Sequence, residues 1–442
     1  MGSSQSGSRN NWARPGWMLG LILAVAVLLR VGYALYLGGE VAAPPLLVDQ
    51  RSYHTLAARV LEGHGFSFPT AWYPNAAPDS PTAFWSFGYV LYLAAIYAAL
   101  GVHPLAARVV GALFNGLLLP WLVYRLARRL FPDQRPVALV AAGCAALYAY
   151  FILYGATLMT ESFYIAALLW TLERSMALAE RPTLAGGAVL GLGLGIATLL
   201  RQSILPWAAV LILWLLWAGW RAGRLRRMVT VLLAAAAVLA LFILPFTIRN
   251  YLAYDSFLLL NSNTGYAMYS AQHPLHGTSF QEFAAAPIPE ELRGLDEARL
   301  DREMLRRGIG FVLAEPGRYL LLSLSRVRDY FEFWPTPGTS LVHNVGRSGS
   351  FGLFLPFMLA GLWLALRAAG PGRSRASWVR FSTTPLALAL LFMIFYSLLH
   401  ILTWAMPRYR LPVDAVALPF AALALVELVR WVSRRLARTG QT

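Results

Sequence analysis

The sequence contains no lysine and few charged residues of any kind. All 37 basic side chains are arginine, and charged residues make up 13% of the 442 residues. Soluble domains carry about a quarter charged residues, so this chain has too little polar surface to cover a water-soluble globule. Hydrophobic residues make up 58% of the chain, and its mean hydropathy is +0.55. Composition alone therefore predicts an integral membrane protein.

Several motifs of soluble enzymes are also absent. The single cysteine, Cys144, lies inside an apolar block and cannot form an internal disulfide. No glycine-rich phosphate loop and no Gly-x-Ser-x-Gly element occurs, so nothing supports a nucleotide donor or a serine hydrolase. The net charge of +16 comes from arginines in short loops, not from a basic stripe interleaved with aromatics, so nucleic-acid binding is not expected. The histidines show no metal-ligand spacing: His54, His64, His103, His273, His276, His343 and His400.

The apolar residues form ten blocks long enough for a helix to cross about 30 Å of hydrocarbon. These predicted spans are 17–37, 104–127, 136–153, 163–180, 183–200, 204–220, 229–248, 351–367, 385–403 and 411–432. An eleventh block, 84–100, is ambiguous. If 84–100 does not cross, nearly all arginine-rich loops and both chain ends fall on the cytoplasmic side, as the positive-inside rule requires. The sequence therefore predicts an all-α polytopic protein in which 84–100 lies on the outer face.

Two large outer segments follow from this topology, 38–103 and 249–350. Within the second, 288–307 is predicted to be a water-facing helix and 308–333 an amphipathic one. The predicted apolar side of 308–333 consists of Phe311, Val312, Tyr319, Leu320, Val327 and Phe331. We expect three parts: a transmembrane module over 1–248, a small helical outer domain over 249–350, and C-terminal transmembrane helices over 351–442.

Two carboxylates in outer loops are candidate catalytic residues. Asp49 opens a predicted short helix about a dozen residues after the first span, and Glu161 lies in the tight turn between the third and fourth spans. Acids are also favoured at helix N-termini, so each residue could simply cap its helix. The functional interpretation is a pair that deprotonates an acceptor hydroxyl, with or without a bridging metal.

Four arginines break the positive-inside pattern because they end spans on the outer side: Arg201, Arg249, Arg408 and Arg410. Guanidinium groups bind phosphate in a fork geometry, so an anionic lipid phosphate of the outer leaflet is the natural ligand. The alternatives are snorkelling to lipid headgroups, or an ion pair with Asp414 or Glu315.

Together these segments resemble the bacterial membrane glycosyltransferases with the GT-C fold, the group of protein O-mannosyltransferases and lipid A aminoarabinose transferases. The likeness covers nearly the whole chain. Its motifs are Asp49-x-x-x-Tyr53-x-x-x-Ala57 followed by Leu61-Glu62-Gly63-His64-Gly65, then Pro81 to Tyr89, Leu158-Met159-Thr160-Glu161, Arg249-Asn250-Tyr251, Asn261 to Tyr266, and Arg408-Tyr409-Arg410-Leu411-Pro412. In the family's Asp-Glu pair this chain has Gln50 as the second residue, and a DxD pair in the second outer turn is absent.

The resemblance implies an inverting transfer of a sugar from a polyprenyl-phosphate donor, with Asp49 as general base and Glu161 positioning the acceptor or a cation. It implies that the donor contacts Tyr53, Arg201, Arg249, Arg408, Tyr409 and Arg410. Acceptor or outer-loop roles would fall to His54, Asn263, Tyr266 and His343. A divalent cation (Mg, Mn or Ca) held by Asp49 and Glu161 is left open. The implied acceptor is a cell-envelope lipid, glycan or protein, and the implied location is the bacterial cytoplasmic (inner) membrane, with the site on the outer face.

Other classes remain open at this stage. An O-antigen ligase or polymerase is also polytopic with a large outer loop, but it uses a diphosphate-linked donor. A lipid or solute transporter would be expected to show pseudo-symmetric halves and charges at mid-membrane depth, and neither is visible in the sequence. An assembly subunit would not require Asp49 or Glu161.

Overall fold

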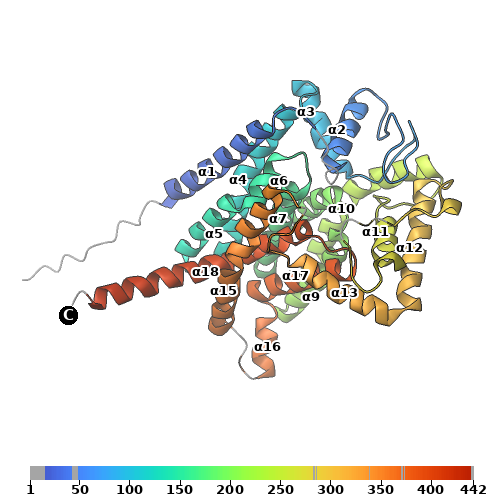
Figure 1. The fold of residues 1–442 in the computed structure, drawn as a ribbon. Helices are drawn as coiled ribbons and strands as arrows, with labels where there is room; N and C mark the ends of the chain where they lie inside the picture. Colours follow the sequence, from blue (N-terminus) through green and yellow to red (C-terminus); the bar gives the residue numbers. More distant parts are fainter. Residues whose placement is uncertain are drawn as a thin grey trace, which may run out of the picture.

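The computed structural model describes residues 15–41, 48–281, 284, 286–337, 339–369, 372 and 374–439. Within these ranges every regular element is a helix, and only two isolated β-bridges occur, Ser67–Pro81 and Trp72–Ala76. Figure 1 shows the helices as one bundle. The start of α1 and the end of α18 lie on the same side, while α2, α11 and α12 lie on the opposite side. The all-α fold is therefore confirmed.

The elements are numbered in chain order. They are α1 Pro15–Leu37, α2 Val48–Leu61, α3 Phe87–Leu100, α4 Pro104–Leu130, α5 Arg135–Leu147, α6 Ala149–Ala156, α7 Glu161–Glu180, α8 Leu184–Leu200, α9 Ile204–Arg221, α10 Leu225–Tyr254, α11 Thr264–Gln272, η1 Pro274–His276, η2 Glu290–Leu292, α12 Glu297–Ala314, α13 Pro316–Tyr330, α14 Leu341–Arg347, η3 Ser348–Gly352, α15 Leu353–Ala369, α16 Arg375–Phe381, α17 Pro385–Leu402 and α18 Pro407–Thr439.

Seven helices in the described residues are long and apolar enough to cross a membrane, and an eighth span results if the bent pair α5–α6 is counted as one. The seven are α1, α4, α9, α10, the continuous α14–α15 segment, α17 and α18. The chain is therefore a multi-pass membrane protein. The two remaining predicted spans, 163–180 and 183–200, correspond to α7 and α8. They do not meet the same criteria, because α7 carries Glu173 and Arg174 within the helix and α8 has only 17 residues.

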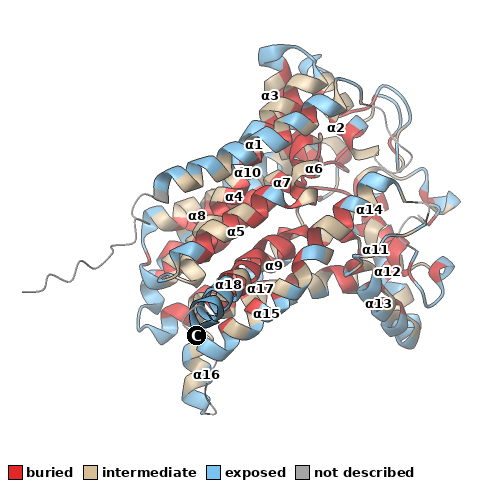
Figure 2. Cartoon of the chain, turned by 60° about the vertical axis from the view of Figure 1, so that its left-hand side comes forward, coloured by how far each residue is buried: buried red, intermediate tan, exposed pale blue. Residues whose placement is uncertain are grey.

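Figure 2 shows buried residues running through the centre of the bundle, where α4, α5, α7 and α18 meet. Some of this packing needs glycine. A Cβ on Gly361 of α15 would lie 1.7 Å from the backbone oxygen of Phe420 in α18, so any side chain there would push the two helices apart. The close approach of α15 and α18 fixes the C-terminal part of the bundle.

The predicted span 136–153 consists of two helices, because the chain bends by 57° between α5 and α6. Such a break frees the last carbonyls of α5 from their helical partners. Arg30, fully buried in α1, donates from Nη2 to the oxygen of Ala145 (3.2 Å) and from Nη1 to that of Ala146 (3.3 Å). One arginine of the first span therefore satisfies the carbonyls that the bend exposes.

The predicted helices 288–307 and 308–333 are also wrong in their boundaries. Asp296 accepts the backbone N–H of Arg299 (2.9 Å) and caps α12, which therefore begins at Glu297. The helix ends at Ala314, and Pro316 begins α13, since proline suits the first turn of a helix. By contrast, α3 has 14 residues, too few to cross the hydrocarbon, as expected for 84–100.

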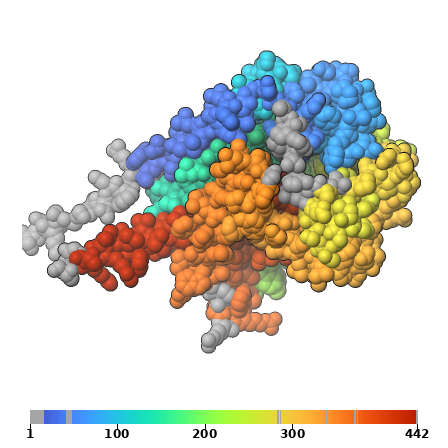
Figure 3. All heavy atoms as spheres, in the orientation of Figure 1, coloured from blue at the N-terminus to red at the C-terminus, as the bar shows by residue number. Residues whose placement is uncertain are grey.

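The two outer segments lie against each other at the end of the bundle. In Figure 3 the blue surface of the first segment adjoins the yellow and orange surface of the second. Glu297 joins them, because its Oε2 accepts bonds from the backbone N–H of Ala83 (2.7 Å) and from the hydroxyl of Ser262 (2.7 Å).

Replacing Arg30 by methionine should destabilise the protein, because the carbonyls of Ala145 and Ala146 would lose their donors while remaining buried. Each unsatisfied buried group costs about 1–3 kcal/mol. We expect a lower melting temperature in detergent and faster amide exchange in α5 and α6. The control is Arg435→Met in the exposed end of α18, and equal melting temperatures for the two variants would contradict the capping role.

Candidate active site

The first carboxylate of the site is Asp49, in the first turn of α2. Its Oδ2 accepts a hydrogen bond from Nη1 of Arg408 at 2.7 Å. Arg408 follows Pro407, the first residue of α18, and so lies in the first turn of that helix. Two residues that are 359 positions apart in the chain therefore form an ion pair.

The second carboxylate, Glu161, begins α7 and is almost fully buried. Its Oε1 lies 2.5 Å from Nη2 of Arg201, the residue that ends α8. The same oxygen lies 3.7 Å from Nη1 of Arg408. Arg201 also donates from Nε to the hydroxyl of Thr160 (3.1 Å). The four charged side chains thus form one connected cluster in the order Asp49, Arg408, Glu161, Arg201.

Aromatic rings surround the two arginines. The guanidinium carbons of Arg201 and Arg408 each lie 5.4 Å from the ring centre of Tyr409. Arg201 also lies 5.9 Å from the ring centre of Tyr164. Burial would lower the pKa of Arg201, but the Glu161 carboxylate outweighs it and raises that pKa above its usual value. The cluster therefore holds two permanent positive charges beside two carboxylates.

The cluster can be reached from outside. The side chains of Asp49, Arg408 and Arg201 are 25%, 20% and 19% exposed, while that of Glu161 is 2% exposed. The Oε2 atom of Glu161 is buried and accepts no hydrogen bond from the described residues. This oxygen therefore has hydrogen-bonding capacity that no described residue uses.

Tyr53 and His54 lie on the side of α2 that packs against α3. The Tyr53 hydroxyl donates to Ser86 (3.3 Å), and burial, followed by the charge of Asp49, raises the pKa of Tyr53. His54 Nδ1 lies 2.9 Å from the hydroxyl of Tyr97, and burial, assisted by Arg108, lowers the pKa of His54. Both residues hold α2 in place, and the structure gives neither a contact with the ion pairs.

Gln50 and Arg108 hold the two carboxylate-bearing elements together, and sequence reasoning assigned neither residue a role. The Oε1 atom of Gln50 accepts bonds from the backbone N–H of Leu158 (3.1 Å) and from Nη2 of Arg108 (3.4 Å). Arg108 also donates to the backbone oxygens of Gly38 (2.5 Å) and Glu40 (3.0 Å). An arginine near the outer end of the span 104–127 was the available signal, because it breaks the positive-inside pattern as Arg201 does.

Two of the predicted phosphate ligands lie elsewhere. Arg410 is fully buried, and it donates to Asp414 (3.0 Å) and to the backbone oxygen of Tyr330. The structure therefore does not present Arg410 to a lipid phosphate, and its pairing matches the alternative weighed from the sequence. Arg249 lies over the rings of Phe66 and Phe87, each at 5.7 Å, and is not part of the charged cluster.

Two residues predicted to have outer-loop roles, His343 and Asn263, lie outside the charged cluster. His343 Nδ1 lies 2.9 Å from the hydroxyl of Ser340, which caps α14, so His343 has a local partner away from the cluster. Asn263 accepts from Nε2 of Gln202 (2.9 Å), the residue after Arg201. The structure thus links Asn263 to the loop that carries Arg201, although Asn263 itself does not contact the charged cluster.

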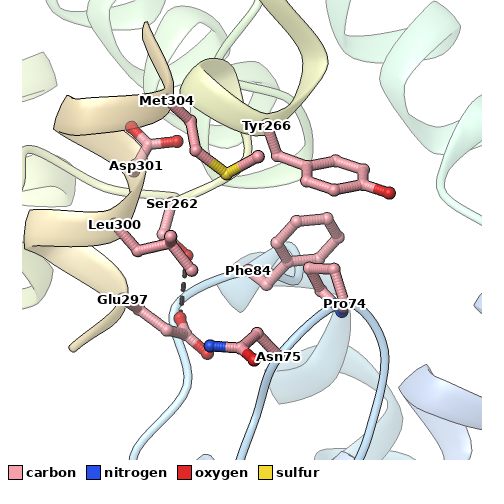
Figure 4. A pocket seen from close by; sticks show the side chains of 9 residues that line it. All are labelled: Pro74, Asn75, Phe84, Ser262, Tyr266, Glu297, Leu300, Asp301 and Met304. Atoms are coloured by element: carbon pink, nitrogen blue, oxygen red, sulfur yellow. Dashed lines mark hydrogen bonds between the residues drawn. The ribbon is translucent and has the colours of Figure 1, made fainter. Parts of the chain in front are cut away.

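Tyr266 belongs to a small pocket between the first outer segment and α11–α12 (Figure 4). Its hydroxyl accepts a hydrogen bond from that of Tyr73 (3.0 Å). In Figure 4 Glu297 and Asp301 lie on successive turns of α12. The rings of Tyr266 and Phe84 lie on the opposite side of the pocket. The lining residues are Pro74, Asn75, Phe84, Ser262, Tyr266, Glu297, Leu300, Asp301 and Met304.

The residues of the cluster do not fit a bridging metal. Among the described residues no group of three His, Cys, Asp or Glu side chains could hold an ion. The Arg408 guanidinium lies between Asp49 and Glu161, where a bridging cation would have to sit. The arginine supplies the positive charge that the two carboxylates share.

The fold agrees with that of two solved membrane enzymes. The archaeal oligosaccharyltransferase AglB from Archaeoglobus fulgidus, solved with an inhibitory peptide and a dolichol-phosphate, matches with a TM-score of 0.57 and 16% identity. The match covers 98% of this chain and 52% of AglB. ArnT from Cupriavidus metallidurans, bound to undecaprenyl phosphate, matches with a TM-score of 0.53 and 16% identity, over 93% of this chain and 60% of ArnT. The chain has the GT-C fold.

A sequence match points the same way. Residues 89–247 match the family model for dolichyl-phosphate-mannose-protein mannosyltransferase. That stretch includes Glu161 and Arg201 but not Asp49 or Arg408. No curated protein sequence matches the chain. The chain spans about half the length of AglB, 52%, so what it shares with these enzymes is the GT-C module.

Asp301 should make the stability of the outer domain depend on pH. Burial raises its pKa from 3.8 to about 6, although it accepts the backbone N–H of Gly265 at 2.6 Å. Between these two pH values the folded state binds the proton more tightly than the unfolded state, so stability falls as pH rises through this window. Asp301→Asn removes that loss, which amounts to at most about 3 kcal/mol.

The measurement is the melting temperature of wild type and Asp301→Asn at pH 4.5 and pH 7.5. The melting temperature of the variant relative to wild type should be higher at pH 7.5 than at pH 4.5. Glu290→Gln, at a side chain that is 90% exposed, is the control and should show no such change. A pH-independent difference for Asp301→Asn would contradict the assignment.

Proposed function

We propose that the protein is a glycosyltransferase that moves a sugar from a polyprenyl-phosphate-linked donor to an acceptor hydroxyl at the outer face of a membrane. One observation carries this proposal. Asp49, Glu161, Arg201 and Arg408 come from four different outer connections of a GT-C fold, yet they form one accessible cluster. A structural ion-pair network would not require this opening to the outside.

The proposed chemistry needs a base and a place for the leaving phosphate. Asp49 takes the proton of the acceptor hydroxyl as its oxygen attacks the anomeric carbon, and the bond from that carbon to the lipid phosphate breaks. Attack from the side opposite the leaving group inverts the configuration at that carbon. Arg408 orients Asp49 through the 2.7 Å bond from Nη1 to Oδ2, and the other oxygen, Oδ1, is left for the proton.

Arg201 and Arg408 form the proposed phosphate site. Both are partly exposed and both are held by carboxylates, so their positions are set before a ligand binds. When the lipid phosphate leaves, it gains negative charge, and two guanidinium groups stabilise that charge in a site of low water content. The unpaired Oε2 of Glu161 would accept a hydroxyl of the bound sugar or acceptor.

The similar structures support the donor class. AglB was solved with a dolichol-phosphate and ArnT with undecaprenyl phosphate, both polyprenyl phosphates. AglB was also solved with an inhibitory peptide, which supports a protein as one candidate acceptor. The arginine distribution supports a site on the outer face, and we propose the bacterial inner membrane as its location.

Asp49→Asn should abolish sugar transfer without unfolding the protein. Asparagine keeps the size of the side chain and a hydrogen-bond acceptor for Arg408, but it cannot accept the proton. We expect a loss of at least about 100-fold in kcat, the usual contribution of a general base. The assay uses purified protein and a panel of short-chain polyprenyl-phosphate sugars with candidate acceptors.

The matched control is Asp255→Asn, an exposed outer aspartate with φ of 45°, a conformation that asparagine adopts readily. It should transfer sugar at the wild-type rate. Wild-type turnover by Asp49→Asn would refute the base assignment. Transfer only from diphosphate-linked donors would favour the O-antigen ligase class instead.

Gln50→Ala should lower kcat by about 10- to 100-fold with little change in the KM for the donor, because displacements near 1 Å have such effects. Alanine removes the acceptor for Leu158 and Arg108, so α2 loses its link to the turn before Glu161. Gln50→Glu retains an acceptor oxygen and should restore most of the rate. Equal rates for Gln50→Ala and wild type would show that Gln50 does not position Asp49.

A further inference from the structure

Helix α13 exposes apolar side chains that a helix on the surface of a soluble domain would turn toward the core. Its apolar side chains Leu320, Leu321, Leu324 and Val327 point outward, with exposures from 38% to 61%. Its buried side consists of Leu322, Ser323, Tyr330 and a fully buried arginine, Arg326, so four further apolar side chains remain outside. The predicted apolar side of 308–333 therefore exists in part, but Leu320 and Val327 lie on the surface of the protein and not in its core.

Arg326 fixes this orientation. It donates to Oε1 of Gln272 (3.1 Å) and to the backbone oxygens of Ala271 and Ile401, and it lies 4.8 Å from the ring centre of Phe280. Rotating α13 to bury its leucines would remove a charged group from all of these partners. The outward apolar stripe, which we define as Leu320, Leu321, Leu324 and Val327, is therefore a fixed feature of the folded protein.

The stripe lies level with the end of a membrane span. The hydroxyl of Tyr319 donates to the backbone oxygen of Leu402 (3.1 Å), the last residue of α17. On α17 itself, Ile394, Leu398 and Leu402 are exposed, as expected for a span that faces lipid. The stripe thus adjoins side chains that already require a hydrocarbon environment.

Helix α14 also carries exposed apolar side chains. Leu341 and Val345 of α14 are 78% and 58% exposed, and α14 runs directly into the candidate span that ends at Ala369. Arg328 lies over the ring of Trp334 at 5.8 Å, between α13 and α14. Tryptophan and arginine are typical of the level where hydrocarbon meets headgroups.

We propose that α13 lies in the outer leaflet of the membrane, parallel to its surface, with the apolar stripe among the lipid chains. The outer domain is then held on the bilayer and does not project freely into water. Figure 2 shows α13 at the edge of the molecule, next to α12 and away from the bundle centre, as this arrangement requires. Interfacial helices of this kind bind through one apolar face and keep their charged groups at headgroup level.

Two features favour lipid over a protein partner. The stripe adjoins the outer end of α17, whose exposed apolar side chains a bilayer must cover, so lipid is already present at its border. Arg328, which flanks the stripe, is exposed and can meet anionic headgroups. The inference does not depend on the proposed sugar transfer, because it rests on helix orientation alone.

Anchoring would also affect the charged cluster. The backbone oxygen of Tyr330, the last residue of α13, accepts a bond from Arg410, two residues after Arg408. A helix held in the leaflet would therefore fix the first turn of α18, which carries the arginine that pairs with Asp49.

The test uses single-cysteine variants in a Cys144→Ala background, because Cys144 is the only cysteine in the sequence. Leu324→Cys is labelled with a small fluorophore and the protein is reconstituted into vesicles of phosphatidylcholine and phosphatidylglycerol. The control is Arg306→Cys on α12, at a side chain that is 80% exposed. Val327→Cys provides a second position on the stripe in case Leu324→Cys does not fold.

Quenching by a nitroxide on the lipid acyl chain is compared with quenching by aqueous iodide. The label at Leu324 should be quenched by the lipid nitroxide at least about fivefold more than the label at Arg306, and less by iodide. Iodide quenching equal to that at Arg306 would overturn the proposal. Protection from both quenchers would overturn it in favour of a protein partner or a second copy of the chain.

Discussion

The guanidinium of Arg408 lies between two carboxylates that reach it from distant parts of the chain. Glu161 is almost fully buried, so loss of its arginine partners would leave a buried charge without compensation, which costs about 3–5 kcal/mol. Asp49, Glu161 and Arg201 are therefore interdependent with Arg408. To satisfy these charges, the starts of α2, α7 and α18 and the end of α8 must meet at one place.

Arginines also bind backbone carbonyls at several helix ends and at the bend between α5 and α6. Arg30 binds the carbonyls at the bend between α5 and α6, and Arg108 binds those after α1. Arg326 and Arg410 bind carbonyls at the ends of α11, α17 and α13. A guanidinium has five donors in a rigid fork, so one side chain can satisfy several carbonyls, whereas a lysine ammonium has three donors on a compact group. The absence of lysine from the sequence is consistent with this use.

The sequence identified site residues best where an ionisable side chain lies at the membrane boundary, because such a position is energetically unfavourable without a partner. Asp49, Glu161, Arg201 and Arg408 stood out as ionisable groups at the outer membrane boundary, and the structure brings these four together. The same argument also selected Arg410, which the structure pairs with Asp414 inside the bundle. An outer arginine signals that a partner exists, but it does not reveal whether that partner is a ligand or the protein itself.

By itself, the sequence determined that the chain lies in a membrane, which ends of its helices carry arginine, and which motifs the GT-C resemblance rests on. These properties follow from composition and from local order along the chain. Only the tertiary structure decided where the span 136–153 bends, that Gln50 joins α2 to the turn before Glu161, and that α13 turns its leucines outward. Each of these depends on a polar contact between residues far apart in the chain, and periodicity within one segment carries no information about such contacts.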